Sequence, residues 1–402
     1  MTEKIRKVYI DYNATAPLHP EVKAAIIEDL EIFGNASSMH ASGRLAHSRI
    51  EQARSAVGNL IGIKNGSSSS GRIVFTSGGS EANNTVFNTM SRLAFGEVYS
   101  KTNTGGRNEI ITTSIEHPCV LNSALNLQKA GLKVIILPVD EFGKVRIEAL
   151  QNAVSSKTLL VSVMSANNEI GTIQDIKEIA AIVKNEGAFF HVDAVQAAGK
   201  IPVNAVDLGA DYLTLSAHKI YGPKGVGALY IKNGSPIFPL IYGGHHEDGA
   251  RAGTYNNGGI LGFGKAAEIA AAQVETYGAE ISALRDKLRR GIENTIPNIK
   301  INGHPKDSLP NTLNISFPGA EGEAILLSMD MQGIEASTGS ACASGSLEPS
   351  HVLLAAGLGP ELAHGSIRFS LGWGISEGDI DYVIEKLPPI IARLRSMSTV
   401  DA

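Results

Sequence analysis

The chain has 402 residues, of which 43% are hydrophobic and 19% charged, and its formal net charge is −5. This length allows two or three domains with a large buried core, and the composition is that of an ordinary soluble α/β protein. The charge gives no reason to expect nucleic acid or an anionic membrane as a partner, and no apolar run approaches the ~18 residues of a membrane span.

The N-terminus and the cysteines favour a reducing compartment. The first ten residues lack the apolar centre and the small-residue cleavage site of a signal peptide. Only two cysteines occur, Cys119 and Cys342, and they lie far apart in the sequence. We therefore expect a cytoplasmic enzyme.

The N-terminal part predicts a short strand, a polar loop and two helices. The strand covers Val8–Ile10, and the loop D-Y-N-A-T-A-P (Asp11–Pro17) follows it. Helical periodicity extends over Pro20–Phe33 and over Gly43–Ile61.

A strand, a Gly/Ser turn and a helix are predicted in I-V-F-T-S-G-G-S-E-A-N-N (Ile73–Asn84). Such a turn offers backbone N–H groups and the positive end of a helix, which together can hold a phosphate. The stretch has neither the Gly-Lys-Ser/Thr of a Walker loop nor a G-x-G-x-x-G pattern. A plain strand–helix turn is the alternative.

The next strand, Glu109–Ser114, ends in I-E-H-P-C-V. A histidine just beyond the carboxyl end of a strand lies where open α/β sheets place their ligands, so His117 is a candidate site residue, the alternative being a hydrogen-bonded loop histidine. Cys119 has apolar neighbours and is predicted to be a small buried hydrophobe.

The middle of the chain alternates strands and helices, which predicts a mostly parallel sheet with crossover helices on both faces. Asn167 and Asn168 follow one strand of this series, where a side-chain amide could hold a carboxylate or a ring oxygen. The expected elements are strands 132–138, 158–164, 188–192, 213–216 and 226–231, with helices 146–154 and 175–185.

Two motifs in this region point to pyridoxal 5'-phosphate (PLP). In F-F-H-V-D-A-V-Q (Phe189–Gln196) an apolar strand ends at Asp193, and in S-A-H-K-I-Y-G-P-K-G (Ser216–Gly225) Lys219 follows a strand. A lysine at a strand end can bind a carbonyl cofactor as a Schiff base, and PLP also needs a carboxylate that keeps its ring nitrogen protonated.

The adjacent His245 and His246 have no third ligand at a suitable spacing, so no metal site is predicted. A long helix is expected from Ile260 to about Ile296, linking to a smaller α+β domain. That domain is predicted to contain strands near 311–317 and 366–371 and helices at 322–332 and 377–397.

Cys342 lies in E-A-S-T-G-S-A-C-A-S-G-S-L-E-P-S (Glu335–Ser350) and is surrounded by small residues alone. A structural cysteine would be expected among bulky apolar residues, so this composition predicts an exposed thiol on a mobile loop, the alternative being an incidental loop cysteine. Arg368, on the apolar strand S-I-R-F-S-L-G, suits bidentate capture of a carboxylate or, alternatively, a structural ion pair.

Taken together, these motifs resemble the NifS/IscS-like cysteine desulfurases, PLP enzymes of the class V aminotransferase group, over nearly the whole chain. The lysine motif indicates only the broad group, whereas G-S-A-C followed by S-L-E-P-S is typical of desulfurases with a long catalytic loop. The resemblance implies PLP-dependent transferase fold type I, similar to aspartate aminotransferase. It implies a large α/β domain (residues 17–264) with a mixed, mostly parallel seven-stranded sheet. The smaller α+β domain, residues 1–16 and 265–402, would carry the catalytic cysteine loop.

The resemblance also implies roles for individual residues. Lys219 would bind PLP covalently, Asp193 would pair with the ring nitrogen, Gln196 would reach the ring hydroxyl oxygen, and His117 would stack on the ring. The phosphate would be bound by Gly79, Ser80, Ser216 and His218, together with Thr254 from the other subunit of a homodimer. The substrate carboxylate would be held by Arg368 and Asn168, with Asn13 as a further substrate-binding residue.

The implied reaction removes sulfur from L-cysteine, which gives L-alanine and a persulfide on Cys342. The sulfur would pass to an acceptor protein such as an Fe–S scaffold. A selenocysteine lyase and an aminotransferase of the same fold are alternatives. A scaffold subunit without cofactor is disfavoured because Lys219, Asp193, His117 and Cys342 are all present, and an NAD-dependent oxidoreductase fits the alternation but not the motifs.

Overall fold

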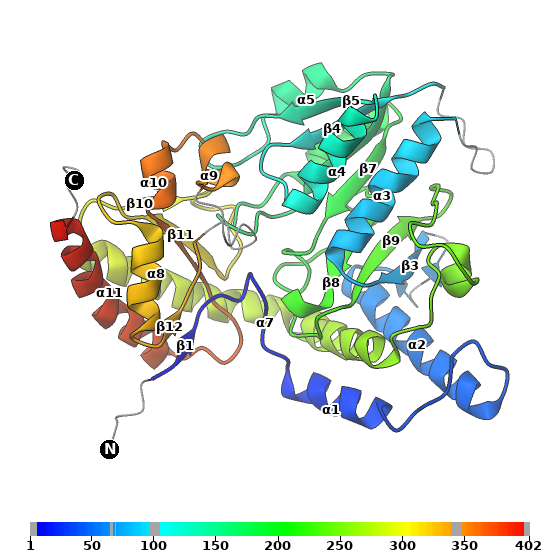
Figure 1. Ribbon diagram of the computed structural model, residues 1–402, viewed down its shortest axis with the longest axis horizontal. Coiled ribbons are helices and arrows are strands. Elements are labelled where there is room, and N and C mark those ends of the chain that lie inside the picture. Colours follow the sequence, from blue (N-terminus) through cyan, green and yellow to red (C-terminus); the bar gives the residue numbers. More distant parts are fainter. Residues whose placement is uncertain (1–5, 65–66, 69, 97–104, 339–347, 398–402) are drawn as a thin grey trace.

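The computed structural model describes residues 6–64, 67–68, 70–96, 105–338 and 348–397 (Figure 1). Cys342 therefore lies outside the described residues. Within the described part of the chain, none of the helices has the length and apolar character required to cross a membrane.

The larger part of the molecule is built on a mixed sheet. Seven strands run across it in the order β3-β9-β8-β7-β6-β4-β5, and the two-residue strand β2 (Ser67–Ser68) pairs at the β3 edge. Pairing is parallel from β8 to β5, whereas β9 is antiparallel to both of its neighbours. The predicted mixed, mostly parallel seven-stranded sheet is confirmed. The bounds are Gly71–Thr76 (β3), Glu109–Thr113 (β4), Lys133–Leu137 (β5), Thr158–Met164 (β6), Phe189–Asp193 (β7), Tyr212–Ser216 (β8) and Gly227–Lys232 (β9).

Helices cover both faces of this sheet because its central strands are apolar on both sides. All seven residues of β6 are buried, as expected for a parallel strand between two helical layers. One core cluster includes α3 (Gly79–Ala94) and α4 (Pro118–Lys129), and the other includes α2 (Ala41–Leu60), α5 (Ile147–Ala153), α6 (Ile176–Asn185) and the first part of α7. Helix α1 (Pro20–Asp29) packs beside α7.

Helix α7 (Asn257–Thr295) connects this core to a second one. Phe263 belongs to the core of the large sheet, whereas Leu288 belongs to the separate C-terminal core. We propose that the domain boundary lies within this helix, with residues 17–264 in one domain and residues 1–16 and 265–402 in the other.

In the described residues, the smaller region contains two small sheets and four further helices, two of which have only five residues. The strands β10 (Lys300–Asn302), β11 (Thr312–Ser316) and β13 (Ser366–Ser370) form an antiparallel sheet, and β1 (Val8–Tyr9) pairs with β12 (Ile334–Glu335). The helices are α8 (Gly322–Asp330), α9 (His351–Ala355), α10 (Pro360–His364) and α11 (Glu377–Met397). The N-terminal strand thus lies beside the C-terminal region (Figure 1).

Candidate active site

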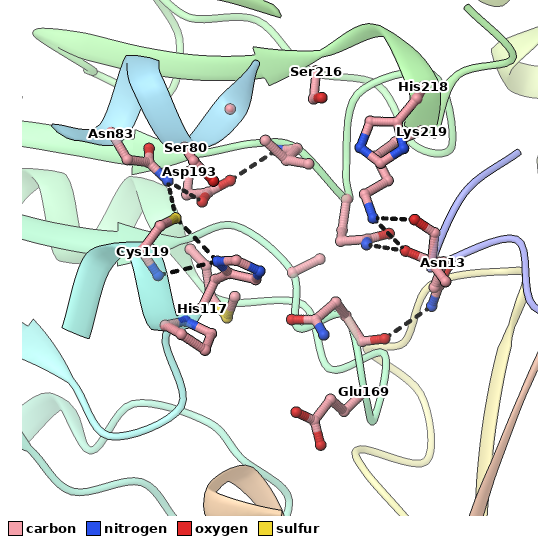
Figure 2. A pocket seen from close by; sticks show the side chains of 18 of the residues that line it. Asn13, Ser80, Asn83, His117, Cys119, Glu169, Asp193, Ser216, His218 and Lys219 are labelled. Atoms are coloured by element: carbon pink, nitrogen blue, oxygen red, sulfur yellow. Dashed lines mark hydrogen bonds between the residues drawn. The ribbon is translucent and has the colours of Figure 1, made fainter. Parts of the chain in front are cut away.

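A cavity of about 480 Å³ opens where the parallel strands β6, β7 and β8 end (Figure 2). Ligands of open α/β sheets bind at this carboxyl edge. The cavity brings together eleven of the residues that the sequence singled out: Asn13, Gly79, Ser80, His117, Asn168, Asp193, Gln196, Ser216, His218, Lys219 and Arg368. Thr254 is exposed and is not among the lining residues, and Cys342 falls in the part of the chain left undescribed.

Lys219 enters the cavity from a single 3-10 turn, Ala217–Lys219, that directly follows β8. Its Nζ donates hydrogen bonds to the backbone carbonyl oxygens of Asn13 at 2.6 Å and Ala14 at 2.7 Å (Figure 2). The polar N-terminal loop therefore holds the amine at the cavity wall.

Asp193, the last residue of β7, is buried at the cavity wall. Its Oδ2 accepts a hydrogen bond from Nδ2 of Asn83 at 2.8 Å, and its Oδ1 accepts one from the backbone N–H of Val195 at 3.0 Å (Figure 2). Both carboxylate oxygens are thereby fixed in orientation. The sequence analysis did not identify Asn83, although its position four residues after Gly79 places both on one face of α3.

His117 caps the N-terminus of α4, a helix that was not predicted. Its Nδ1 accepts a hydrogen bond from the backbone N–H of Cys119 at 3.2 Å, and the Sγ atom of Cys119 lies 3.0 Å from the same nitrogen. Because a backbone N–H can only donate, the neutral ring carries its proton on Nε2. Burial lowers the pKa of His117, which favours this neutral form.

Cys119 is half-buried and lines the cavity, so the prediction of a simple buried hydrophobe was incomplete. Besides His117, its Sγ contacts Nδ2 of Asn83 at 3.1 Å. Burial and the nearby charge of Asp193 raise the pKa of the thiol to about 12, so the sulfur remains protonated at neutral pH.

The N-terminus of α3 forms another part of the wall. Its N-cap residue, Gly78, supplies no side-chain cap, so the first-turn N–H groups carry the positive end of a 16-residue helix. A Cβ at Gly79 would lie 3.0 Å from Cγ2 of Val195, so glycine permits this close approach to the segment just after β7. Ser80 and Ser216 lie on the same wall.

His218 precedes the lysine and lies beside the N-terminal loop. Its Nδ1 is 3.2 Å from Oγ1 of Thr15. Burial, with the positive charge of Lys219 nearby, lowers the pKa of His218 to about 4. The imidazole is therefore neutral at pH 7 and can offer one N–H donor without adding charge.

Arg368 projects from β13 into the opposite wall. Its Nη2 forms an ion pair with Oδ1 of Asp11 at 2.7 Å, and its Nη1 donates to the carbonyl oxygen of Asn168 at 3.0 Å. Its Nε has no hydrogen-bond partner among the described residues. The geometry is therefore compatible with both hypotheses for Arg368. Its ion pair with Asp11 can be structural, and its unused Nε–H group remains for a carboxylate.

Asn13 is the centre of a buried hydrogen-bond network rather than a free ligand group. Its Nδ2 donates to the carbonyl oxygen of Asn168 at 3.1 Å and to Thr312 at 2.8 Å. Its Oδ1 accepts from Asn311 at 3.0 Å and from Lys200 at 2.8 Å. The side-chain amide is thus fully engaged inside the protein, so a direct contact with substrate would require one of these bonds to break.

Two buried acids near the cavity were missed by the sequence analysis. Oε1 of Glu116 accepts hydrogen bonds from Thr113 at 2.7 Å and from the backbone N–H of Met164 at 2.9 Å, and burial raises the pKa of Glu116 to about 8. Oε2 of Glu169 accepts from Ser350 at 2.5 Å, and burial raises the pKa of Glu169. In the part of the chain that the structure describes, no group of three histidine, cysteine or acidic side chains could hold a metal ion.

Comparison with known proteins places this geometry in a family. Residues 8–383 match the family model described as Aminotransferase class-V. The chain is 49% identical over 397 residues to a protein named cysteine desulfurase IscS from Clostridium botulinum, covering 98% of this chain and 96% of that protein. A protein of the same name from Dictyoglomus turgidum is 47% identical, with 98% and 96% covered. A solved structure of a NifS-like protein superimposes with a TM-score of 0.87 at 38% identity, covering 96% of this chain and all of the other.

Proposed function

The chain belongs to the class-V aminotransferase family, and we propose that it is a PLP-dependent cysteine desulfurase. The observation that carries the proposal is that one cavity is lined by the amine of Lys219, the buried carboxylate of Asp193 and the guanidinium of Arg368. Lys219 can bind a carbonyl cofactor, Asp193 can keep the ring nitrogen of that cofactor protonated, and Arg368 can hold the carboxylate of an amino acid. The similarity to proteins named cysteine desulfurase supports the choice of substrate.

The residues present fit PLP at each of its polar ends. Asp193 is buried and held by two donors, as a partner for a protonated ring nitrogen should be. The uncapped N-terminus of α3, with Ser80, suits a phosphate. When bound, PLP would supply a carbonyl carbon that condenses with an amine and an electron sink for the Cα carbanion. Lys219 would form the covalent link.

Lys219 would also act as the base that removes the Cα proton of cysteine. A released lysine amine can take a proton only if it remains near the substrate. The carbonyl oxygens of Asn13 and Ala14 support this role because they accept hydrogen bonds from Nζ and would keep the freed amine at the cavity wall.

His117 would lie against the cofactor ring and present the N–H of Nε2. Its Nδ1 is engaged by the backbone of Cys119, so the neutral ring donates from Nε2 and takes up a further proton only at Nδ1. The lowered pKa of His117 favours the neutral ring at physiological pH. A proton shuttle through this residue would therefore begin with donation from Nε2.

Cys342 would accept the sulfur atom. Its thiolate attacks the sulfur of cysteine, an S–S bond forms, the Cβ–S bond of the substrate breaks, and protonation at Cβ completes alanine. Cysteine and the enzyme thiol together contain all the atoms of alanine and the enzyme persulfide, so no external oxidant is needed. The persulfide would then pass to an acceptor protein such as an Fe–S scaffold.

We also propose that the enzyme is a cytoplasmic homodimer. Phe33 and Met39 are 89% and 90% exposed, respectively, which is unusual for large apolar side chains. The carbonyl oxygen of the adjacent Gly34 accepts a hydrogen bond from Asn257 at 3.3 Å, so the segment from Phe33 to Met39 lies next to the start of α7, three residues after Thr254. A second copy covering the segment would let Thr254 reach the partner's phosphate site.

The proposal is tested by comparing wild type with Cys342→Ala. We expect both proteins to show the near-visible absorbance of bound PLP, while the variant loses release of alanine and sulfide from L-cysteine. Cys119→Ala is the matched control for loss of a thiol and is expected to retain alanine release within severalfold. Unchanged release of alanine and sulfide by Cys342→Ala would contradict the proposal that Cys342 accepts the sulfur, and would favour a PLP lyase that needs no enzyme thiol. A wild-type protein without PLP absorbance after reconstitution would contradict the proposal from its first step.

A further inference from the structure

Lys200 is a buried cation next to the candidate site, and none of the roles described above uses it. It is 3% exposed and lies four residues after Gln196. Among the described residues no carboxylate lies within ion-pair distance of its Nζ. A lysine is almost never fully buried unless it is paired, so the contacts it does make require an explanation.

The amine of Lys200 bridges two side-chain amides. Its Nζ donates to Oε1 of Gln196 at 2.5 Å and to Oδ1 of Asn13 at 2.8 Å. Burial, with the positive charges of Lys219 and Arg368 nearby, lowers the pKa of Lys200. Even the neutral amine has two N–H groups, so it can still make both of these bonds.

The other end of each amide meets a group that can only accept. Nε2 of Gln196 donates to the backbone carbonyl oxygen of Asn13 at 3.0 Å, and Nδ2 of Asn13 donates to that of Asn168 at 3.1 Å. Donors at one end and carbonyl oxygens at the other leave one orientation for each amide. A flipped Gln196 would turn its NH₂ group toward Lys200 and leave its oxygen facing a carbonyl.

We propose that Lys200 is a positioning residue that fixes the carboxamide of Gln196 so that a second N–H of Nε2 faces the cofactor. Gln196 lines the cavity, and only one of its two N–H groups is used by Asn13. The inference rests on the proposed function, because the ring hydroxyl oxygen of PLP is the acceptor that this N–H would meet. The same contacts hold Asn13, whose carbonyl oxygen accepts from Lys219.

The test measures PLP binding to apoprotein, together with the pH titration of the bound chromophore, for Lys200→Met, Gln196→Met and the double variant. We expect each single variant to weaken PLP binding about tenfold, the usual effect of losing one buried hydrogen bond. The double variant should be no weaker than Gln196→Met alone, since Lys200 acts through Gln196. Both single variants should shift the pH midpoint upward, because the N–H stabilises negative charge on the ring oxygen.

Further variants keep the test decisive. Lys177→Met makes the same chemical change at an exposed position and should bind PLP as wild type does. Gln196→Glu keeps an acceptor for Lys200 but has no N–H to offer, either to the cofactor or to the carbonyl oxygen of Asn13, so it should bind PLP weakly. If Lys200→Met does not fold, Lys200→Gln, which keeps a polar side chain at the buried position but is too short to hold both amides, takes its place and should weaken PLP binding and raise the pH midpoint in the same way. Additive effects in the double variant, or a Gln196→Glu protein that binds as tightly as wild type, would overturn the inference. Wild-type apoprotein that does not bind PLP would instead overturn the proposed function.

Discussion

Nη2 of Arg368 lies 2.7 Å from Oδ1 of Asp11, and this ion pair joins the N-terminal loop to the strand β13 at the cavity wall. The side chain of Arg368 is 2% exposed, whereas that of Asp11 is 18% exposed. A charge-assisted bond to a guanidinium fixes its plane as well as its position. Asp11 therefore sets how Arg368 faces an incoming carboxylate.

We predict that Asp11→Asn raises the KM for L-cysteine by about fivefold, because a neutral amide holds the guanidinium less firmly than a carboxylate does. Binding of PLP to the apoprotein should change little, since the expected cofactor contacts lie on other residues. Steady-state alanine formation and PLP titration measure the two effects separately. Asp379→Asn, which alters an exposed ion pair with Arg6, serves as the control. An unchanged KM in Asp11→Asn would show that the pair is purely structural.

The thiol of Cys119 should react slowly with alkylating reagents. The raised pKa of Cys119 leaves little thiolate at pH 8, so we expect iodoacetamide to modify it at least tenfold more slowly than a free cysteine in a peptide. Mass spectrometry of peptides after timed alkylation of native protein measures this rate. Unfolding in urea should abolish the protection, which serves as the control. Rapid modification of Cys119 in the native protein would refute the assignment of a neutral, half-buried thiol.

Much of the fold followed from periodicity in the sequence. The strand Thr158–Met164 and the helix Glu377–Met397 have the predicted bounds. An unbroken apolar run predicts the buried strand, and a regular amphipathic pattern predicts the helix. Helix α4 was not predicted, although Pro118 stands at its first position. Proline is well tolerated at the first turn of a helix, and His117 provides the cap that begins this one.

Site residues at strand ends were predictable, whereas the residues that hold them were not. Asp193 ends one apolar strand and Lys219 stands three residues after the end of another, and parallel strands bring such positions to one edge. Asn83 and Lys200 act through contacts between elements distant in sequence, and spacing alone does not specify those contacts. The sequence contains one signal for Lys200. In Q-A-A-G-K it stands four residues after Gln196, a spacing that places two side chains on the same side of a helical turn.

The exposed segment that includes Phe33 should mediate self-association. We predict that Phe33→Glu shifts the protein from dimer toward monomer in analytical ultracentrifugation, since burying a charge in an apolar interface is costly. PLP binding should weaken in parallel, because Thr254 would no longer reach a partner subunit. Leu327→Glu changes another exposed apolar residue, on α8, and should leave the dimer intact. A Phe33→Glu protein that stays dimeric would show that the dimer interface does not include this segment.

Glu116 should make stability fall as the pH rises. Its pKa is about 8 in the folded protein, raised mainly by burial from the ordinary value of 4.5, so the native state keeps a proton that the unfolded chain releases. This stabilising contribution is complete below pH 4.5 and is lost as the pH rises toward 8. We predict that Glu116→Gln, which retains Oε1 as an acceptor for Thr113 and Met164, removes the dependence and gains on the order of 3 kcal/mol at pH 8 relative to pH 5. Urea unfolding across this range measures the slope, with the exposed Glu178→Gln as the control. A wild-type slope in Glu116→Gln would mean that Glu116 is already ionised in the folded protein at neutral pH.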